Sequence, residues 1–87
     1  MYYVYILQSG KDNNHYVGYT NDLRRRLKEH NEGKNFSTAP RIPFKLIYYE
    51  AYIDKKDAVE REKFFKTGWG RQYTKRVLKH YLGAVKK

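Results

Sequence analysis

Cysteine is absent from this 87-residue sequence, so neither a disulfide framework nor a thiolate metal site is available to it. Proline is scarce, with two residues, and the chain has no run of about 18 apolar residues that could cross a bilayer. The first residues lack the basic segment and apolar stretch of a secretory signal. We therefore expect a cytoplasmic protein with no membrane span, held together by packing of its ten tyrosines, four phenylalanines and one tryptophan.

Negative charge is also scarce, and it is unevenly spread. The chain has 19 Lys and Arg against 9 Asp and Glu, a formal net charge of +10. Residues 1–60 hold 10 basic and 8 acidic side chains, whereas residues 61–87 hold 9 basic side chains and a single acid, Glu62. This balance predicts a polyanionic partner, such as nucleic acid or an acidic membrane surface. The alternative is a generic basic surface without a dedicated partner.

The chain is long enough for one hydrophobic core, and we expect a single α+β domain over residues 1–83 with a basic tail at 84–87. Runs of β-branched and aromatic residues predict strands, and capping residues and glycines predict where helices begin and end. The expected strands cover residues 2–8, 15–20 and 44–53, and the expected helices run from about 23 to near Gly33, from Asp54 to about Lys66, and over 71–82. Residues 34–43 are expected to form a loop, and Gly68–Gly70 a break. The order β-β-α-β-α-α predicts an α/β sandwich, a three-stranded, mainly antiparallel sheet flanked by about three helices.

Two tyrosines on the expected hairpin are candidates for chemistry. Tyr5 and Tyr16 are eleven positions apart, so paired strands could bring both hydroxyls to one face. Gly18 beside them would let another backbone or a phosphate approach closely. Each tyrosine taken singly also fits a core residue whose hydroxyl reaches the surface.

Two charged positions on the expected helices are further candidates. Arg26 and His30 are four positions apart, so their side chains leave the same helix face, and a guanidinium suits phosphate oxygens. The alternative is a solvated basic face. Glu62 likewise has two interpretations: an ion pair with its basic neighbours, or a ligand that holds a divalent cation against a phosphate.

Together these residues resemble the GIY-YIG nuclease superfamily, over residues 1 to about 68. That family has two tyrosine motifs, an arginine ten residues after the second tyrosine, often a histidine four residues later, and a glutamate on a later helix. The matching segments here are Val4-Tyr5-Ile6, Tyr16-Val17-Gly18, Arg26, His30 and Glu62. The chain looks most like the short, single-domain bacterial members, which resemble the nuclease domain of the excision-repair C subunit.

The resemblance indicates which of two glutamates is the functional one. The sequence also departs from the family pattern at two places. The run Glu60 to Phe65 is similar to the acidic helix of the phage homing endonucleases, whose second glutamate is the functional one, and this favours Glu62 over Glu60. Tyr3 replaces the glycine of the first motif. Many family nucleases have an asparagine near the end of the domain, and none occurs between Gly68 and Lys87.

The resemblance implies a divalent-metal-dependent endonuclease that hydrolyses phosphodiester bonds in DNA, with single-stranded or branched substrates plausible, in repair or recombination. Glu62 would hold one Mg²⁺ or Mn²⁺, with phosphate and water oxygens completing the shell. Tyr5 would act as general base or orient the attacking water, and its pKa must fall for this, with help from Tyr16, Arg26 and the metal. Arg26 would neutralise phosphate oxygens, and His30 would serve as a second phosphate donor or a proton carrier.

Further basic residues are expected to bind the nucleic-acid backbone without reading bases. Trp69 could stack on an unpaired base, or it could fill the core between helices. The expected nucleic-acid-binding residues are Arg24, Arg25, Lys66, Trp69, Arg71, Lys75, Arg76 and Lys79. A membrane-surface role is not favoured, because the third helix lacks a wide apolar face.

Two other functions stay open at this stage. One is a non-catalytic nucleic-acid-binding module with a degenerate nuclease fold, which the missing asparagine supports. The other is a small adaptor recruited to an acidic protein, which no particular feature of the sequence favours; protein partners are unknown.

Overall fold

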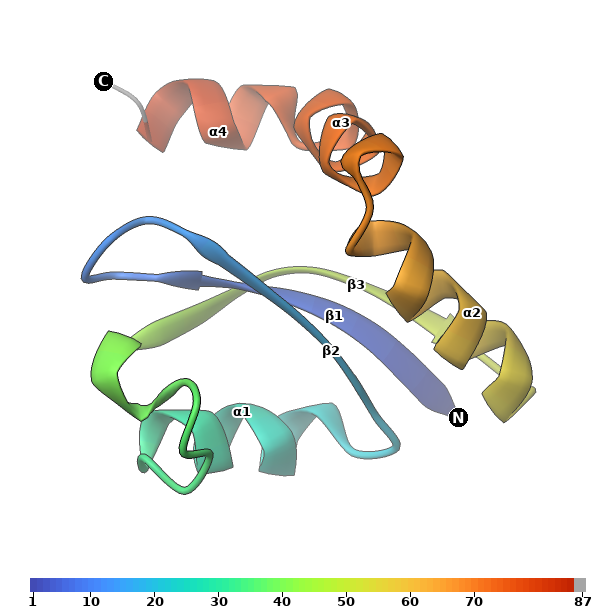
Figure 1. Ribbon diagram of the computed structural model, residues 1–87, viewed down its shortest axis with the longest axis horizontal. Helices are drawn as coiled ribbons and strands as arrows, with labels where there is room; N and C mark the ends of the chain where they lie inside the picture. Colours follow the sequence, from blue (N-terminus) through green and yellow to red (C-terminus); the bar gives the residue numbers. More distant parts are fainter. Residues whose placement is uncertain (86–87) are drawn as a thin grey trace.

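The protein folds as a three-stranded antiparallel sheet with helices on both sides (Figure 1), in a computed structural model that describes residues 1–85, with side chains as far as Gly83. The elements in chain order are β1 (Tyr2–Ser9), β2 (His15–Thr20), α1 (Leu23–Asn31), η1 (Ala39–Arg41), β3 (Phe44–Tyr52), α2 (Lys55–Phe65), α3 (Gly68–Val77) and α4 (Lys79–Val85). The predicted α+β class, the three strands and the β-β-α-β-α-α order are confirmed.

The central strand of the sheet is β1, which pairs antiparallel with β2 on one side and β3 on the other. Both faces of β1 are covered, and this explains why its sequence is apolar almost throughout. Val4 and Ile6 pack on one face of the sheet, and Tyr5 and Leu7 pack on the other.

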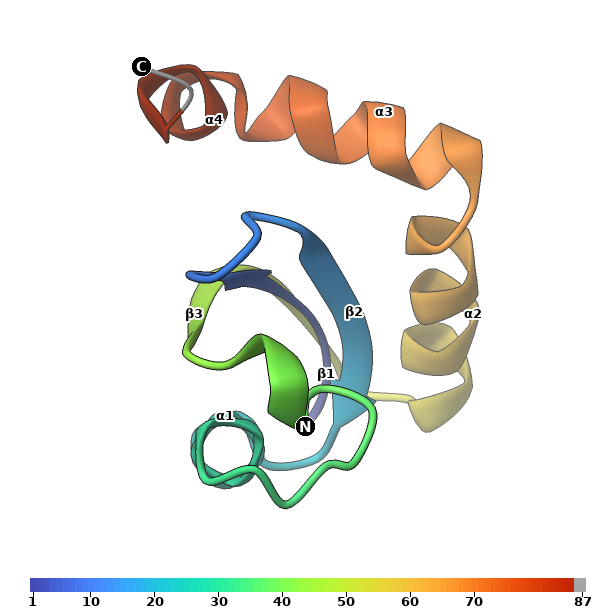
Figure 2. The same ribbon diagram turned by 60° about the vertical axis from the view of Figure 1, so that its left-hand side comes forward.

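Different helices cover the two faces of the sheet. α1 covers the face that carries Tyr5, with Leu27 in that cluster. α2 and α3 cover the opposite face, where Phe65 packs against Val4. Figures 1 and 2 both show α1 on one side of the sheet and the C-terminal helices α3 and α4 on the other.

α1 is fixed at both ends by short polar side chains. Asp22 caps its N-terminus by accepting from the backbone N–H of Arg25 at 3.1 Å. At the other end the Asn31 amide accepts from the backbone N–H of Phe44 at 2.6 Å and donates to its carbonyl at 3.0 Å. Gly33 follows with φ of 75°, a left-handed conformation that ends the helix as predicted.

The predicted break at Gly68–Gly70 is wrong, because α3 begins there. Thr67 supplies the missing start signal: its hydroxyl accepts from the backbone N–H of Gly70 at 3.2 Å. Gly70 has no room for a side chain, since a Cβ there would overlap the Phe64 carbonyl and Phe65 Cα. The glycine therefore serves the close packing of α3 on the end of α2.

The predicted single helix over 71–82 is two helices. Leu78, with φ of −111° and ψ of 24°, leaves helical geometry between α3 and α4. The change of direction lets the Tyr81 hydroxyl donate to the Gln8 side chain on β1. The division into a domain of residues 1–83 and a tail of 84–87 stays a prediction, since α4 continues to Val85 and residues 86–87 lie outside the described part. No helix within residues 1–85 is both long enough and apolar enough to cross a membrane.

Candidate active site

The tyrosine of the first motif lies over the glycine of the second. Tyr5 is 2 % exposed, and its partner in the β1–β2 register is Gly18. A Cβ at position 18 would overlap the Tyr5 hydroxyl and ring. The expectation that Gly18 admits a phosphate or another backbone is therefore wrong, because the ring of Tyr5 fills that space.

A chain of hydrogen bonds leads from Tyr5 into the protein. The Tyr5 hydroxyl lies 3.0 Å from His30 Nε2, and His30 Nδ1 lies 2.9 Å from Thr38 Oγ1. The Asn35 carbonyl lies 3.4 Å from the Thr38 hydroxyl and can take its proton, which leaves the hydroxyl able to accept from His30 Nδ1–H. In that tautomer Nε2 of a neutral His30 is the acceptor, and the Tyr5 hydroxyl donates to it.

The electrostatics keep this pair neutral in the free protein. Burial, followed by the nearby charge of Arg26, lowers the pKa of His30 below its ordinary 6.5, against an opposing effect of Glu29. Burial raises the pKa of Tyr5 above 10.0, although the Arg26 guanidinium counteracts it. The expected fall in the Tyr5 pKa is therefore not found in the free protein, and Tyr16 contributes to raising it.

Two more of the predicted residues adjoin the Tyr5–His30 pair. The ring of Tyr16 meets that of His30 edge-on, with centroids 5.1 Å apart, and lies 6.4 Å from that of Tyr5. Arg26 lies beside the Tyr5 phenol and pairs with Glu29 at 3.2 Å. Tyr16 and Arg26 are only half-buried, whereas His30 is completely buried. His30 therefore presents no exposed surface to a phosphate in this structure, and both of its predicted roles stay predictions.

Glu62 comes from α2, which packs on the face of the sheet opposite α1. Its carboxylate is half-buried and pairs with Lys66 at 3.2 Å, one helical turn later. The negative charge of Glu62 is near enough to Tyr5 to raise its pKa. Glu60, by contrast, is exposed. Among the described side chains no group of three or more His, Asp or Glu gathers to hold a metal ion.

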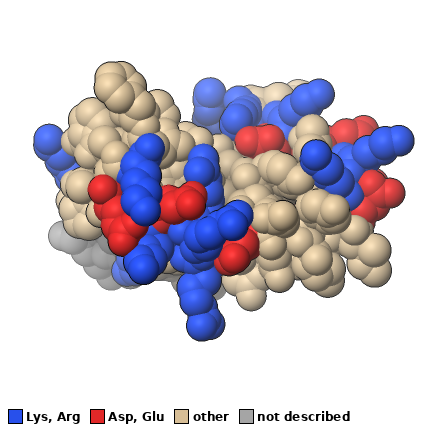
Figure 3. Space-filling view, turned by 90° about the horizontal axis from the view of Figure 1, so that it is seen from below, with Lys and Arg blue, Asp and Glu red and all other residues tan. Residues whose placement is uncertain are grey.

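The basic surface of α1 is interrupted by acidic residues. Figure 3, which looks onto α1, shows Lys and Arg interleaved with Asp and Glu on this face. Arg24 and Arg25 are exposed there, and Arg25 lies 3.9 Å from Glu29. This face therefore offers guanidinium groups without forming a uniformly positive patch.

The remaining predicted nucleic-acid-binding residues lie on or next to the C-terminal helices. Trp69 is 79 % exposed near the start of α3, so the alternative that it fills the core is wrong. The basic members of this group are all exposed, and they are Lys66, Arg71, Lys75, Arg76 and Lys79.

Sequence reasoning missed Thr38, which orients His30. Thr38 is completely buried although it lies in a stretch of small polar residues that is expected to form a surface loop. The loop contains the short helix η1, which follows Thr38 directly. Nothing in the local sequence distinguishes this threonine from Ser37, which is exposed.

An ion pair that joins β3 to α2 was also missed. Glu50 accepts from Arg61 Nε at 2.7 Å and from a terminal nitrogen at 3.1 Å. The hydroxyls of Tyr48 and Tyr52 donate to the same carboxylate at 2.7 and 2.6 Å. The Arg61 guanidinium also lies over three aromatic rings, 4.7–4.8 Å from the centroids of Phe64, Phe65 and Tyr73. The sequence did contain a signal for this cluster: Glu50 lies between Tyr48 and Tyr52 at alternate positions of one strand, so all three side chains share a face.

Known proteins share both the sequence and the fold. The chain is 45 % identical over 65 residues to UPF0213 protein spr1390 of Streptococcus pneumoniae strain R6, and 42 % identical over 66 residues to UPF0213 protein YazA of Bacillus subtilis strain 168. These matches cover 74 % and 75 % of this chain but only 65 % and 66 % of the relatives, so the chain spans just under two thirds of their length. The solution NMR structure of the UPF0213 protein BH0048 from Bacillus halodurans is similar with a TM-score of 0.54 at 39 % identity, over 88 % of this chain and 83 % of that one.

The family assignment follows from the extent of the match. Residues 1–75 match the family model of the GIY-YIG catalytic domain, a segment that contains Tyr5, Tyr16, Arg26, His30 and Glu62. The chain therefore belongs to the GIY-YIG family, and it is similar to its small bacterial UPF0213 members.

Proposed function

We propose that this protein is a divalent-metal-dependent endonuclease that hydrolyses phosphodiester bonds in DNA, in the context of repair or recombination. The observation that carries the proposal is the hydrogen bond between Tyr5 and a neutral, fully buried His30, beside Arg26. Membership of a nuclease superfamily supports it. The bond places a titratable acceptor 3.0 Å from the buried tyrosine hydroxyl.

The Tyr5–His30 pair supplies a route for a proton. The attacking water must lose a proton as its oxygen bonds to phosphorus. Tyr5 can accept that proton on its oxygen while it passes its own to His30 Nε2, so the number of protons balances. Thr38 holds the imidazole in the tautomer that this transfer needs, because it accepts from Nδ1–H. Tyr5 therefore does not have to exist as a phenolate beforehand, which agrees with its raised pKa.

Arg26 and Tyr16 are placed to contact the reacting phosphate. Both are half-buried beside Tyr5, and the guanidinium of Arg26 presents a planar set of donors that fits phosphate oxygens. Negative charge increases on those oxygens in the transition state, and a donor already held in place stabilises it there. The pairing with Glu29 at 3.2 Å fixes the orientation of the guanidinium.

Glu62 is the residue that would hold the metal ion. Its half-buried carboxylate is a hard oxygen donor, and GIY-YIG nucleases generally use a divalent metal. One carboxylate fits a site in which phosphate and water oxygens provide the remaining ligands. When bound, Mg²⁺ or Mn²⁺ would neutralise charge on the phosphate and the leaving oxygen. Lys66, now paired with Glu62, is then free to contact a phosphate itself.

The proposed contacts to the nucleic-acid backbone come from two sides of the molecule. Arg24 and Arg25 lie on α1, and Lys66, Arg71, Lys75, Arg76 and Lys79 lie on or beside the C-terminal helices. Such contacts position a strand without reading its sequence. The exposed indole of Trp69 adds a surface on which an unpaired base can stack.

The test is cleavage of labelled single-stranded, duplex and branched DNA by the wild type in Mg²⁺, in Mn²⁺ and in EDTA. Glu62→Ala should abolish metal-dependent cleavage, whereas Glu60→Ala, a matched change on the exposed side of the same helix, should leave it intact. Binding without cleavage by the wild type under every metal condition would instead establish the non-catalytic module, for which the absent C-terminal asparagine is the supporting feature.

A further inference from the structure

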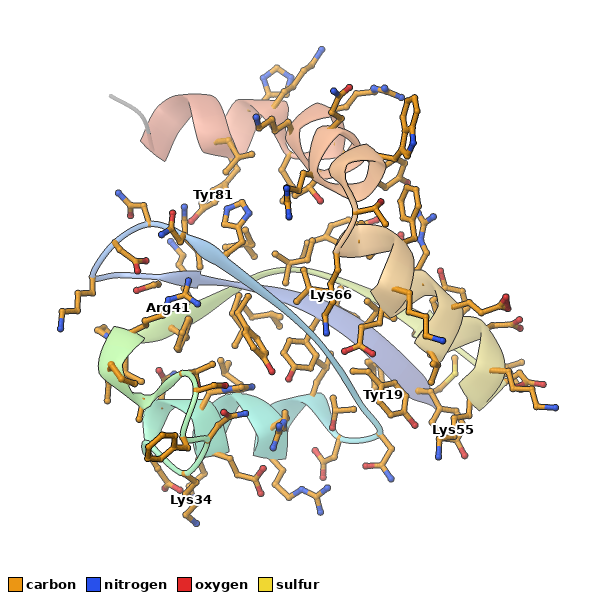
Figure 4. The ribbon with its side chains drawn as sticks, viewed as in Figure 1. Tyr19, Lys34, Arg41, Lys55, Lys66 and Tyr81 are labelled. Carbon is orange, nitrogen blue, oxygen red and sulfur yellow. The ribbon has the colours of Figure 1, made fainter. Side chains whose placement is uncertain are left out.

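A hollow lies between the β1–β2 hairpin and helices α3 and α4, on the face of the sheet opposite α1. Its volume is about 740 Å³, in the range of cavities that take small molecules of nucleotide size. Tyr81 donates to Gln8, a lining residue, and so ties α4 to β1 at the hairpin end; Figure 4 shows Tyr81 pointing from α4 toward the hairpin. The hydrogen bond between Tyr81 and Gln8 therefore holds the two sides of the hollow, α4 and the β1–β2 hairpin, together at this end.

The floor of the hollow is apolar and its rim is basic. Ile6 and Phe65, 1 % and 2 % exposed, lie at the floor. The exposed cations Lys66, Arg71 and Lys75 line it as well, and no acidic residue does. This combination suits a ligand with a flat apolar part and a negative charge attached to it.

Two residues connect the hollow to the proposed catalytic site. Lys66 lines the hollow and pairs with Glu62 at 3.2 Å; in Figure 4 its side chain extends from the end of α2 toward β2. Tyr16 on β2 also lines the hollow, while its ring lies on the α1 face of the sheet against His30, so β2 is shared by the hollow and the Tyr5–His30 pair. A strand whose phosphate lies at Arg26 and Glu62 can thus continue over the β2 edge into the hollow.

We propose that this hollow binds an unpaired nucleotide of the substrate strand, its base on the apolar floor and its phosphate at the basic rim. The inference rests on the proposed nuclease function and narrows its substrate to DNA with unpaired nucleotides next to the cleaved bond. A base in a duplex stays stacked and paired, so it cannot enter the hollow without the cost of extrusion. Single-stranded segments present their bases freely.

The test is fluorescence-anisotropy binding of a labelled single-stranded oligodeoxythymidylate, in EDTA so that no cleavage takes place. Lys75→Glu is compared with Lys63→Glu, the same charge reversal at an exposed lysine of α2 that does not line the hollow. We expect the Lys75 change to weaken binding about tenfold more than the Lys63 change, and an oligonucleotide with abasic positions to bind the wild type about fivefold to tenfold more weakly. A hairpin duplex should bind more weakly than the single strand.

Equal losses from the two substitutions, or equal affinity for the abasic and normal strands, would overturn the proposal and leave only a diffuse basic surface. Thermal unfolding of both variants by circular dichroism ensures that folded proteins are compared. Since binding is measured without metal, this result is independent of catalysis. Cleavage by the wild type with no preference for unpaired DNA would contradict the inference about the hollow but support the nuclease function. Selective single-strand binding without cleavage would support the hollow and contradict the nuclease function.

Discussion

The hydroxyl of Tyr5 and Nε2 of His30 meet at 3.0 Å, although 25 residues separate them in the chain. β1 supplies the tyrosine and the last turn of α1 supplies the histidine, so the contact depends on how α1 packs on the sheet. Both groups are buried, so each is the other's means of satisfying a polar atom away from water. The pair is therefore at once a structural contact and a route for a proton.

Replacing Tyr5 with phenylalanine tests this double role. The ring remains but Nε2 of His30 loses its donor, so we expect a loss of about 1–3 kcal/mol in the free energy of unfolding. Cleavage should fall about 10²–10⁴-fold, because the proton acceptor is gone. Urea unfolding and single-turnover cleavage provide the measurements. Tyr3→Phe on the same strand is the control, and a Tyr5→Phe protein that cleaves as well as this control would refute the role of the hydroxyl.

Thr38 should act through His30. Thr38→Val removes the acceptor for Nδ1–H while it conserves the shape of the side chain, and we expect it to cost about 1–3 kcal/mol of stability. Cleavage should fall as well, because the imidazole is no longer held in one tautomer. Thr38→Ser keeps the hydroxyl and should restore the pH profile of cleavage. If valine and serine gave the same profile, Thr38 would have no effect on the tautomer.

The lowered pKa of His30 gives a dependence of stability on pH. Below the ordinary value of 6.5 the unfolded chain gains a proton at His30 that the folded protein resists, so stability is present above pH 6.5 and is lost as the pH falls toward the folded pKa. Urea unfolding across this window should show the decline. A His30→Leu protein, less stable throughout, should lack this part of the slope. An equal slope in both proteins would assign it to other groups.

The ring of Tyr5 lies so close to Gly18 that only glycine fits at position 18 without a shift of the ring. We expect Gly18→Ala to displace the Tyr5 ring and to cost about 1–3 kcal/mol, since a Cβ would overlap the hydroxyl. Cleavage should fall more than stability predicts, because the bond to His30 is lost with the displacement. Gly68→Ala is a suitable comparison, as nothing lies within 4 Å of a Cβ there. Wild-type cleavage by the Gly18 variant would show that the tyrosine can act from another position.

The fold and the grouping of Tyr5, Tyr16, Arg26 and His30 were largely predictable, because strand composition, capping residues and motif spacing are local signals. The start of the second helix at Asp54, which caps α2, was found in this way. Thr38 was not, because its importance comes from a contact with a residue eight positions away that only the packed loop creates. The helix break at Leu78 was missed for a similar reason: it serves a contact between Tyr81 and the distant Gln8.

The ion pair between Glu50 and Arg61 should hold α2, and with it Glu62, against the sheet. Burial opposes ionisation of Glu50, but Arg61 and the hydroxyls of Tyr52 and Tyr48 outweigh it, so the pKa of Glu50 lies below the ordinary 4.5. Its contribution to stability is therefore present above pH 4.5 and is lost as the pH falls through the folded pKa. Glu50→Gln should cost about 1.5–3 kcal/mol at neutral pH and flatten the acid limb of the unfolding curve.

Arg61→Lys separates the charge of this pair from its geometry. Lysine keeps the positive charge but cannot donate two parallel hydrogen bonds to Glu50, nor stack as a plane on Phe64 and Tyr73. Because the next residue is Glu62, a looser α2 should raise the metal concentration needed for half-maximal cleavage more than it lowers the rate at saturating metal. Lys63→Arg, an exposed neighbour on the same helix, should change neither. A loss of rate at saturation with an unchanged metal requirement would mean that Arg61 stabilises the fold without positioning Glu62.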